Sequence, residues 1–202
     1  SGLRALGQRA ALVTHADGEL LKRAADVEAY GLAPRSEVDV ASGWTLARLI
    51  ARLQPDVIQA HDPHGVAMAS LALSLEAASR WQHGRKAPAL LASRRVDFHL
   101  KAHAFSRWKY RQVDAFIAAS EAIRQMLIGD GVAPERVVTV HEGIDVGRID
   151  DTPAVNVHEA LFLPHGAPVV GNVAALVPHK GQRYLIEAAH LVVQDRKSTR
   201  LN

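Results

Sequence analysis

Cysteine is absent from the 202-residue chain. This absence excludes disulfide bonds, thiolate nucleophiles and zinc–thiolate sites, and it is consistent with a reducing compartment. Aromatic residues make up only 5% of the sequence, so the core must consist mainly of Ala, Val, Leu and Ile. Such small aliphatic residues suit parallel strands packed closely under helices. No apolar run approaches the ~18 residues that a membrane span requires, and residues 1–4 lack the layout of a secretion signal.

A large charge of one sign is also absent. Lys and Arg together number 24 against 21 for Asp and Glu, which gives a net charge of +3. This excess is too small to indicate nucleic-acid binding, and no nucleic-acid partner is expected. Hydrophobic residues make up 48% and charged residues 22%, as in ordinary globular proteins. At ~150 residues per domain, the length predicts one domain and part of a second.

Short β-type runs alternate with amphipathic stretches of helical length. We expect strands at residues 9–14, 37–40, 56–60, 89–93, 115–118, 136–140 and 168–173, and helices at 19–30, 42–53, 65–80, 120–128 and 182–193. Such alternation implies parallel strands joined by right-handed crossovers, with helices on both faces. The sequence therefore predicts an α/β, Rossmann-like domain with a doubly wound parallel sheet.

The composition divides the chain into four parts. Residues 1–150 are expected to form the first domain, and residues 151–166, with their Asp, Pro and Gly, a linker. Residues 167–194 restart the strand–helix pattern and are expected to begin a second domain. Residues 195–202 form a polar tail that matches the in-frame translation of a common sequencing adapter. We expect this tail to be non-native and to carry no function.

Polar residues follow several of the expected strands, where open α/β sheets bind their ligands. His61, Asp62 and His64 follow the third strand, and such residues can bind metal or move protons. Alternatively, the two histidines bond nearby backbone while Asp62 caps the next helix. No further ligand cluster is apparent in the sequence, so a metal site is not expected.

A basic stretch begins where the fourth expected strand ends. Arg94, Arg95 and His99 lead it, and it continues through Lys101, His103, Arg107, Lys109 and Arg111. Paired guanidinium groups suit phosphate or carboxylate, so a polyanionic ligand or an anionic membrane surface could be bound here. The alternative is a solvated basic helix face. That alternative is preferred for the distal residues and stays open for Arg94 and Arg95.

Two further sites could meet phosphate. Ser120 begins a helix and could offer its hydroxyl and the helix N-terminus to a phosphate, or simply cap that helix. Lys180 and Gly181 directly precede another helix, where a lysine is well placed to meet a diphosphate.

Taken together, five segments resemble the family-4 glycosyltransferases. They are residues 55–64, 113–123, 131–137, 143–145 and 177–181, and the resemblance covers nearly all of residues 36–190. The family has the GT-B architecture of two Rossmann-like domains and transfers sugars with retention. The resemblance implies the N-terminal, acceptor-side domain, lacking its first strand, and the first strand–helix unit of the donor-binding domain. The rest of the donor-binding domain would lie beyond residue 194, so the chain as given is expected to be inactive.

The resemblance also assigns roles to individual residues. Lys180, with Gly181, matches the lysine that contacts the donor diphosphate, whereas Ala174 and Ala175 stand where the family has a glycine–arginine pair. Arg95 falls near the point where the family places a histidine beside the transferred sugar, and His99 lies four residues later. Both are therefore the catalytic candidates. The acceptor-binding candidates are His61, Asp62, His64, Arg94 and Ser120.

The resemblance implies transfer of a hexose from a nucleotide sugar to an envelope glycolipid or polysaccharide, without a metal or other cofactor. A cytoplasmic protein is expected, with peripheral contact to the inner face of an anionic membrane as a further expectation. Two alternatives stay open. One is a non-catalytic sugar- or nucleotide-binding module on the same fold, and the other is a metal hydrolase built on residues 61–64.

Overall fold

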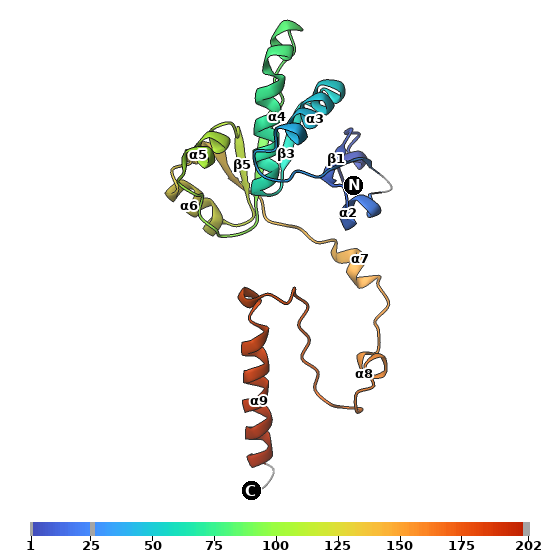
Figure 1. Ribbon diagram of the computed structural model, residues 1–202. Helices are drawn as coiled ribbons and strands as arrows, with labels where there is room; N and C mark the ends of the chain where they lie inside the picture. Colours follow the sequence, from blue (N-terminus) through green and yellow to red (C-terminus); the bar gives the residue numbers. More distant parts are fainter. Residues whose placement is uncertain (1, 25–26, 200–202) are drawn as a thin grey trace. The chain divides into compact units, whose positions relative to one another are not determined.

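The computed structural model describes residues 2–24 and 27–199, with only the backbone described for 196–199. Figure 1 shows the order of the elements along the chain. The chain divides into two compact units, Ser1–Ile144 and Asp145–Asn202, which are described separately below. The candidate residues that follow the first five strands all belong to the first unit.

Parallel strands form two sheets in the first unit. The larger sheet has the order β3 (Val57–Ala60), β4 (Ala89–Arg94), β5 (Ala115–Ala118) and β6 (Val137–Thr139). The smaller sheet pairs β1 (Ala11–His15) with β2 (Glu28–Leu32). Every strand pair of the described residues is parallel. With the helices that connect the strands, this arrangement confirms the α/β, Rossmann-like class. The expected strands lie in two sheets.

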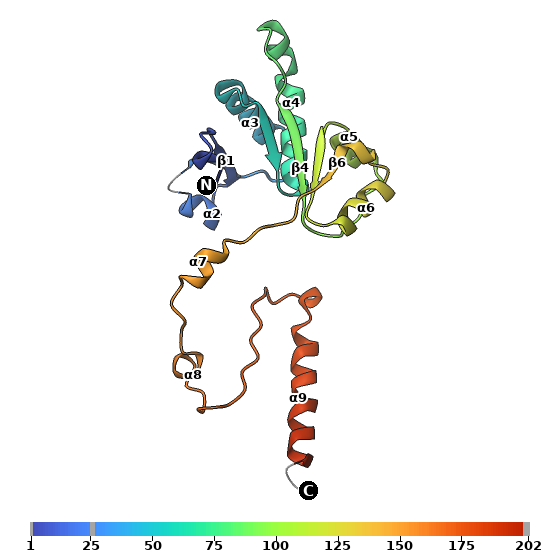
Figure 2. The same ribbon diagram turned by 180° about the vertical axis from the view of Figure 1, so that it is seen from behind.

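Helices cover one face of the larger sheet. α4 (Pro63–Gln82) packs on β3 and β4, and α6 (Glu121–Gly129) packs on β5 and β6. α5 (Ala104–Arg111) contacts α4. Figures 1 and 2 show α4 running along the sheet in both views. The crossover helices therefore enclose one core with the inner face of this sheet. The remaining helical segments of the unit are α1 (Gly2–Ala5), α2 (Glu19–Arg23), α3 (Val40–Leu53) and the 3₁₀ turn η1 (Pro134–Arg136).

The core consists mainly of small aliphatic residues, as the composition predicts. Leu90 and Phe116 alternate with outward-facing neighbours and are almost fully buried. On α4 a row of buried alanines, Ala67, Ala69 and Ala72, lets neighbouring elements approach closely. The strand register pairs Ala92 with Phe116 and aligns the carboxyl ends of β4 and β5. The polar residues that follow these strands are thereby brought to one edge of the sheet.

α3 is fixed by its first turn and by its packing against α4. The Asp39 side chain caps the helix by accepting hydrogen bonds from the backbone N–H groups of Ala41 (3.1 Å) and Ser42 (3.2 Å). Gly43 faces α4, and a Cβ atom there would lie 2.7 Å from Cδ2 of Leu71. A larger residue would therefore require the Leu71 side chain to move.

The Asp39 cap predicts an acid-sensitive contribution to stability. Hydrogen bonds from the backbone of Arg35, then of Ser42, hold the pKa of the Asp39 carboxyl below its usual value. The folded chain therefore binds fewer protons here than the unfolded chain, and this stability is present at neutral pH. It is lost as the pH falls through the pKa of folded Asp39.

Asp39→Asn keeps an acceptor oxygen at the cap but does not titrate. We expect this variant to have a lower free energy of unfolding than the wild type at pH 7. The difference in free energy of unfolding should shrink below about pH 4. Urea unfolding at pH 7 and pH 3 measures this difference. The exposed Glu135 supplies the control variant Glu135→Gln. A difference that is independent of pH would contradict the prediction.

Two predictions near the start of the chain are wrong. The helix expected at 19–30 is a short helix, α2, followed by strand β2, and the strand expected at 37–40 is a turn that leads into α3. Pairing with β1 and packing against α3 override the local helical pattern. The guanidinium carbon of Arg52 lies 5.2 Å from the centre of the Tyr30 ring. At Gly31 an added Cβ would lie 3.0 Å from Cα of Ala16, so glycine permits the close approach.

The second unit contains α7 (Val146–Asp150), α8 (Val157–Ala160), the 3₁₀ turn η2 (Pro178–Lys180) and α9 (Gln182–Thr199). The strand expected at 168–173 is not formed, because a strand needs a hydrogen-bonded neighbour and the described residues of this unit contain none. The helix expected at 182–193 is present and continues to Thr199. It therefore extends into the expected polar tail, of which residues 200–202 lie outside the described part.

Candidate functional site

The turn that follows β3 carries three of the acceptor-site candidates. Asp62 caps α4, because its Oδ1 accepts a hydrogen bond of 2.8 Å from the backbone N–H of Gly65. Pro63 occupies the first position of the helix, where its missing N–H costs nothing. His61 and His64 are exposed at the carboxyl end of the strand. His64 Nδ1 lies 3.7 Å from Oε1 of Glu37, in the segment before α3.

The basic helix α5 buries one of its charges against this turn. The Lys109 ammonium group donates hydrogen bonds to Oε2 of Glu37 (2.8 Å) and to the Pro63 carbonyl (3.0 Å). It also lies over the rings of Phe105 and Tyr110, at 5.6 Å and 5.3 Å. Only 4% of the Lys109 side chain is exposed. The expectation of a solvated basic face is therefore wrong for Lys109.

Arg94, the last residue of β4, lies on the inner face of the sheet and is 6% exposed. Its Nη2 donates to the Phe98 carbonyl. Among the described residues, its buried Nε has no hydrogen-bond partner. Burial raises the pKa of Tyr110; Arg94 opposes this effect, whereas the carboxylates of Glu37 and Asp62 add to it. These side chains thus share one electrostatic environment.

We call this group the carboxyl-edge cluster. It joins the ends of β3 and β4 to α5 and to the segment before α3. Its members are Glu37, Asp62, His64, Arg94, Lys109 and Tyr110.

The two catalytic candidates, Arg95 and His99, are held by different partners. Arg95 forms an ion pair with Glu142, beyond β6, and both side chains are largely exposed. His99 Nδ1 lies 2.6 Å from Oδ1 of Asp130, at the end of α6. The second oxygen of Asp130 accepts a hydrogen bond of 2.7 Å from the backbone N–H of Leu100. Both ends of the loop after β4 are therefore held in place, but Arg95 and His99 contact different carboxylates.

Ser120 caps α6. Its Oγ accepts a hydrogen bond of 3.3 Å from the backbone N–H of Ile123, which is the capping role that the sequence left open. The neighbouring Glu121 accepts hydrogen bonds from Gln125, Thr139 and Arg124, and these lower the pKa of its carboxyl. The N-terminus of α6 is therefore already occupied by side chains of the protein.

Lys180 and Gly181 form a tight turn in the second unit. The backbone N–H of Lys180 donates to the Val177 carbonyl at 3.0 Å, which closes the turn η2. Gly181 adopts φ +72°, the left-handed conformation that glycine favours, and α9 starts at the next residue. The local geometry is thus a lysine on a glycine turn in front of an 18-residue helix.

Comparison with known proteins decides the family. A family model described as Glycosyltransferase Family 4 matches residues 1–148. The chain belongs to this family. No curated protein matches it.

One solved structure is similar to this glycosyltransferase chain, an apo form of the lipopolysaccharide outer core galactosyltransferase WaaB. The similarity has a TM-score of 0.45 at 10% sequence identity. It covers 67% of this chain and 46% of the galactosyltransferase, so the chain spans less than half of that protein.

Neither a metal-ligand set nor a membrane helix is found in the described part of the glycosyltransferase chain. Within residues 2–24 and 27–199, no three His, Asp or Glu side chains come together to hold a metal ion. No helix in those ranges is both long and apolar enough to cross a membrane.

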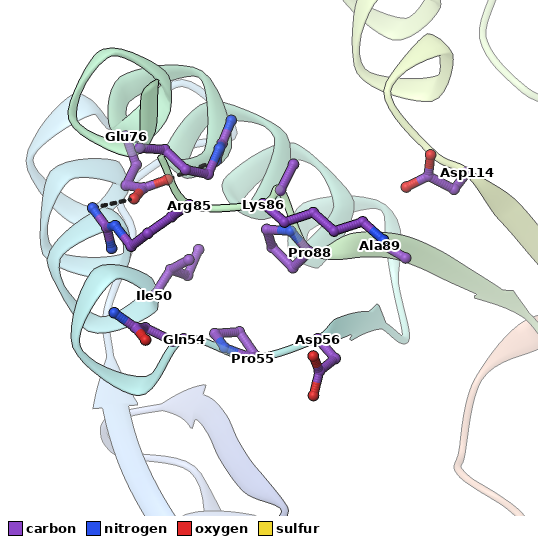
Figure 3. Close-up of a pocket in the computed structure, with 12 residues that line it drawn as sticks. Ile50, Gln54, Pro55, Asp56, Glu76, Arg85, Lys86, Pro88, Ala89 and Asp114 are labelled. Carbon is purple, nitrogen blue, oxygen red and sulfur yellow. Dashed lines mark hydrogen bonds and ion pairs between the residues drawn. The ribbon is translucent and has the colours of Figure 1, made fainter. Parts of the chain in front are cut away.

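A pocket of about 510 Å³ lies at the opposite, amino edge of the larger sheet (Figure 3). Asp56 and Asp114 line it directly before β3 and β5. Its inner wall is an ion-pair network in which the buried Glu76 carboxylate pairs with Arg80 (2.6 Å) and Arg85 (3.0 Å). Arg85 also donates to the Ala51 carbonyl and to Ser79 Oγ, both at 3.1 Å. The guanidinium groups of this wall thus hold α3, α4 and the following loop together.

Several members of the carboxyl-edge cluster were missed by the sequence analysis. The sequence pattern predicts a strand at Glu37 and groups Lys109 with its basic neighbours. One available signal was the spacing of Lys109, four residues after Phe105 and next to Tyr110. At helical periodicity this spacing places Lys109 on the inner, aromatic side of α5.

Proposed function

We propose that the chain is the acceptor side of an enzyme that transfers a hexose from a nucleotide sugar, with retention, to an envelope glycolipid or polysaccharide. The match of residues 1–148 to the glycosyltransferase family carries the proposal. The carboxyl-edge cluster supports its acceptor part, because it gathers charged side chains where parallel α/β sheets bind ligands.

The proposed mechanism is electrostatic. Lys180, on its glycine turn, contacts the donor diphosphate and stabilises the charge that develops as it leaves. Arg95 and His99 lie beside the transferred sugar. His61, Asp62, His64, Arg94 and Ser120 face the acceptor. Because a side chain of the protein stabilises the charge of the leaving diphosphate, this mechanism requires neither a metal nor another cofactor.

The outer face of α5 suits peripheral contact with an anionic membrane at the cytoplasmic side. Arg107 and Arg111 are exposed, and Trp108 is 37% exposed between them. Basic side chains attract anionic lipid headgroups, and an indole ring favours the interface between water and lipid. This face would keep the enzyme close to a glycolipid acceptor.

The test compares the 202-residue chain with the protein extended to the full length of its gene. Each is incubated with UDP-, GDP- and ADP-hexoses and with an envelope lipid extract, and glycosylated products are identified by mass spectrometry. We expect transfer by the full-length protein and none by the 202-residue chain, in which Lys180 is the main group assigned to the donor. A full-length protein that binds a nucleotide sugar without transferring it would instead support the non-catalytic module.

A further inference from the structure

The burial of Lys109 calls for a role beyond stability. Moving an ammonium group out of water costs several kcal/mol, and a buried ion pair is often no more stabilising than apolar residues of similar volume. Yet Lys109, 4% exposed, holds Glu37 at 2.8 Å and the Pro63 carbonyl at 3.0 Å. It thereby ties the segment before α3 to the start of α4. The geometry suggests that Lys109 fixes the position of the Glu37 carboxylate.

The Glu37 carboxylate is held on one side and accessible on the other. Its Oε2 accepts from Lys109, whereas Oε1 lies 3.7 Å from the exposed His64 ring, and 29% of the Glu37 side chain is exposed. A carboxylate accepts hydrogen bonds and cannot donate them. Its charge also disfavours phosphate or carboxylate groups of a ligand at close range. Hydroxyl groups are the donors that suit this position best.

We propose that Glu37 binds hydroxyl groups of a neutral sugar ring in the acceptor, that Lys109 positions its carboxylate, and that His64 borders the same subsite. The inference rests on the proposed function in that the ligand is the acceptor. It assigns the acceptor two regions, an anionic group near the exposed Arg95 and a neutral sugar at Glu37. Glu37 is then a specificity-determining residue, and Lys109 is a positioning residue.

The experiment measures sugar binding by the 202-residue chain, without any donor. Methyl glycosides of glucose, galactose and mannose, and their 6-phosphates, are titrated while ¹H–¹⁵N NMR shifts are recorded. We expect at least one neutral glycoside to shift the resonances of Glu37 and His64, and its 6-phosphate to bind no more tightly. Glu37→Gln should weaken that binding about tenfold, because charge-assisted hydrogen bonds are replaced by neutral ones. The exposed control variant Glu135→Gln should leave it unchanged.

A double-mutant cycle tests the positioning role. Lys109→Met should weaken glycoside binding in the wild-type background but cause no further loss in the Glu37→Gln background. Damage to the fold would instead weaken binding in both backgrounds and would overturn the role of Lys109. If Lys109→Met does not fold, Glu37→Gln and Glu37→Asp still test the carboxylate, with Asp expected to retain more affinity than Gln. Equal binding by the wild type and Glu37→Gln, or no shift with any glycoside, would overturn the inference.

The outcome is distinguishable from that of the proposed function. Glycoside binding is read in the absence of donor, so it is measured whether or not the full-length protein transfers sugar. A failed transfer assay with intact, Glu37-dependent binding would contradict the enzyme proposal alone. Transfer together with Glu37-independent binding would contradict only the subsite.

Discussion

Glu76→Ala is expected to lower the free energy of unfolding by about 3 kcal/mol. Glu76 is 5% exposed and forms ion pairs with both Arg80 and Arg85, whose side chains are 16% and 21% exposed. Removing one partner of a buried ion pair leaves its charges uncompensated and costs roughly 3–5 kcal/mol. The lower end of that range applies here because both arginines retain bonds to backbone carbonyls and some contact with water.

Urea unfolding followed by circular dichroism measures the effect, with Glu135→Ala as the exposed control. Glu76→Gln should fall between Ala and the wild type, because it keeps the volume and one acceptor oxygen but removes the charge. The pocket at the amino edge should also open in Glu76→Ala, since Arg85 joins α4 to the end of α3. A loss below about 1 kcal/mol would mean that the two guanidinium groups simply turn to solvent.

Most of the larger sheet could be predicted from the sequence because its local and tertiary signals agree. The strand expected at 115–118 forms there, and those expected at 56–60, 89–93 and 136–140 agree within two residues. The same holds for the helix expected at 120–128. β2 could not be predicted, since Glu28–Leu32 has no strand-like alternation and is a strand only because β1 lies beside it. The strand expected at 168–173 is the converse case, an apolar run without a neighbour to pair with.

The sequence predicts where the candidate site lies better than it predicts which residues form it. The polar residues after β3 and β4 do lie at the carboxyl edge, as the topology of a parallel sheet requires. Asp62 and Ser120 cap their helices, which the residue type already allowed. Glu37 could not be predicted, because its contact with Lys109 spans 72 residues and follows from tertiary packing alone. The sequence also could not show that Arg94 is buried and Arg95 exposed, because it does not show which face of β4 points into the core.

Arg95 and Arg107 offer a matched pair for testing the anionic part of the acceptor site. Both are arginines on the basic stretch, and both are exposed. Arg95 leaves the carboxyl end of β4, whereas Arg107 lies on the outer face of α5. The partner of Arg95, Glu142, is as exposed as Arg95 itself, so breaking that pair should hardly change stability. A change in activity can then be attributed to the site.

In the active full-length protein, we expect Arg95→Ala to lower kcat/KM for a phosphate- or carboxylate-bearing acceptor by roughly tenfold to a hundredfold. A charge-assisted hydrogen bond contributes about 1.5–3 kcal/mol, and each ~1.4 kcal/mol is a factor of ten. Arg107→Ala should cost little, and its effect should vanish as added salt screens the exposed charge. Glu142→Gln removes the competing carboxylate and should leave acceptor use unchanged or improve it. The test is to measure kcat/KM for all three variants while the concentrations of acceptor and salt are varied. If both arginine variants lose the same activity and added salt removes both losses, the basic stretch is only a diffuse charged surface and Arg95 has no specific role in acceptor binding.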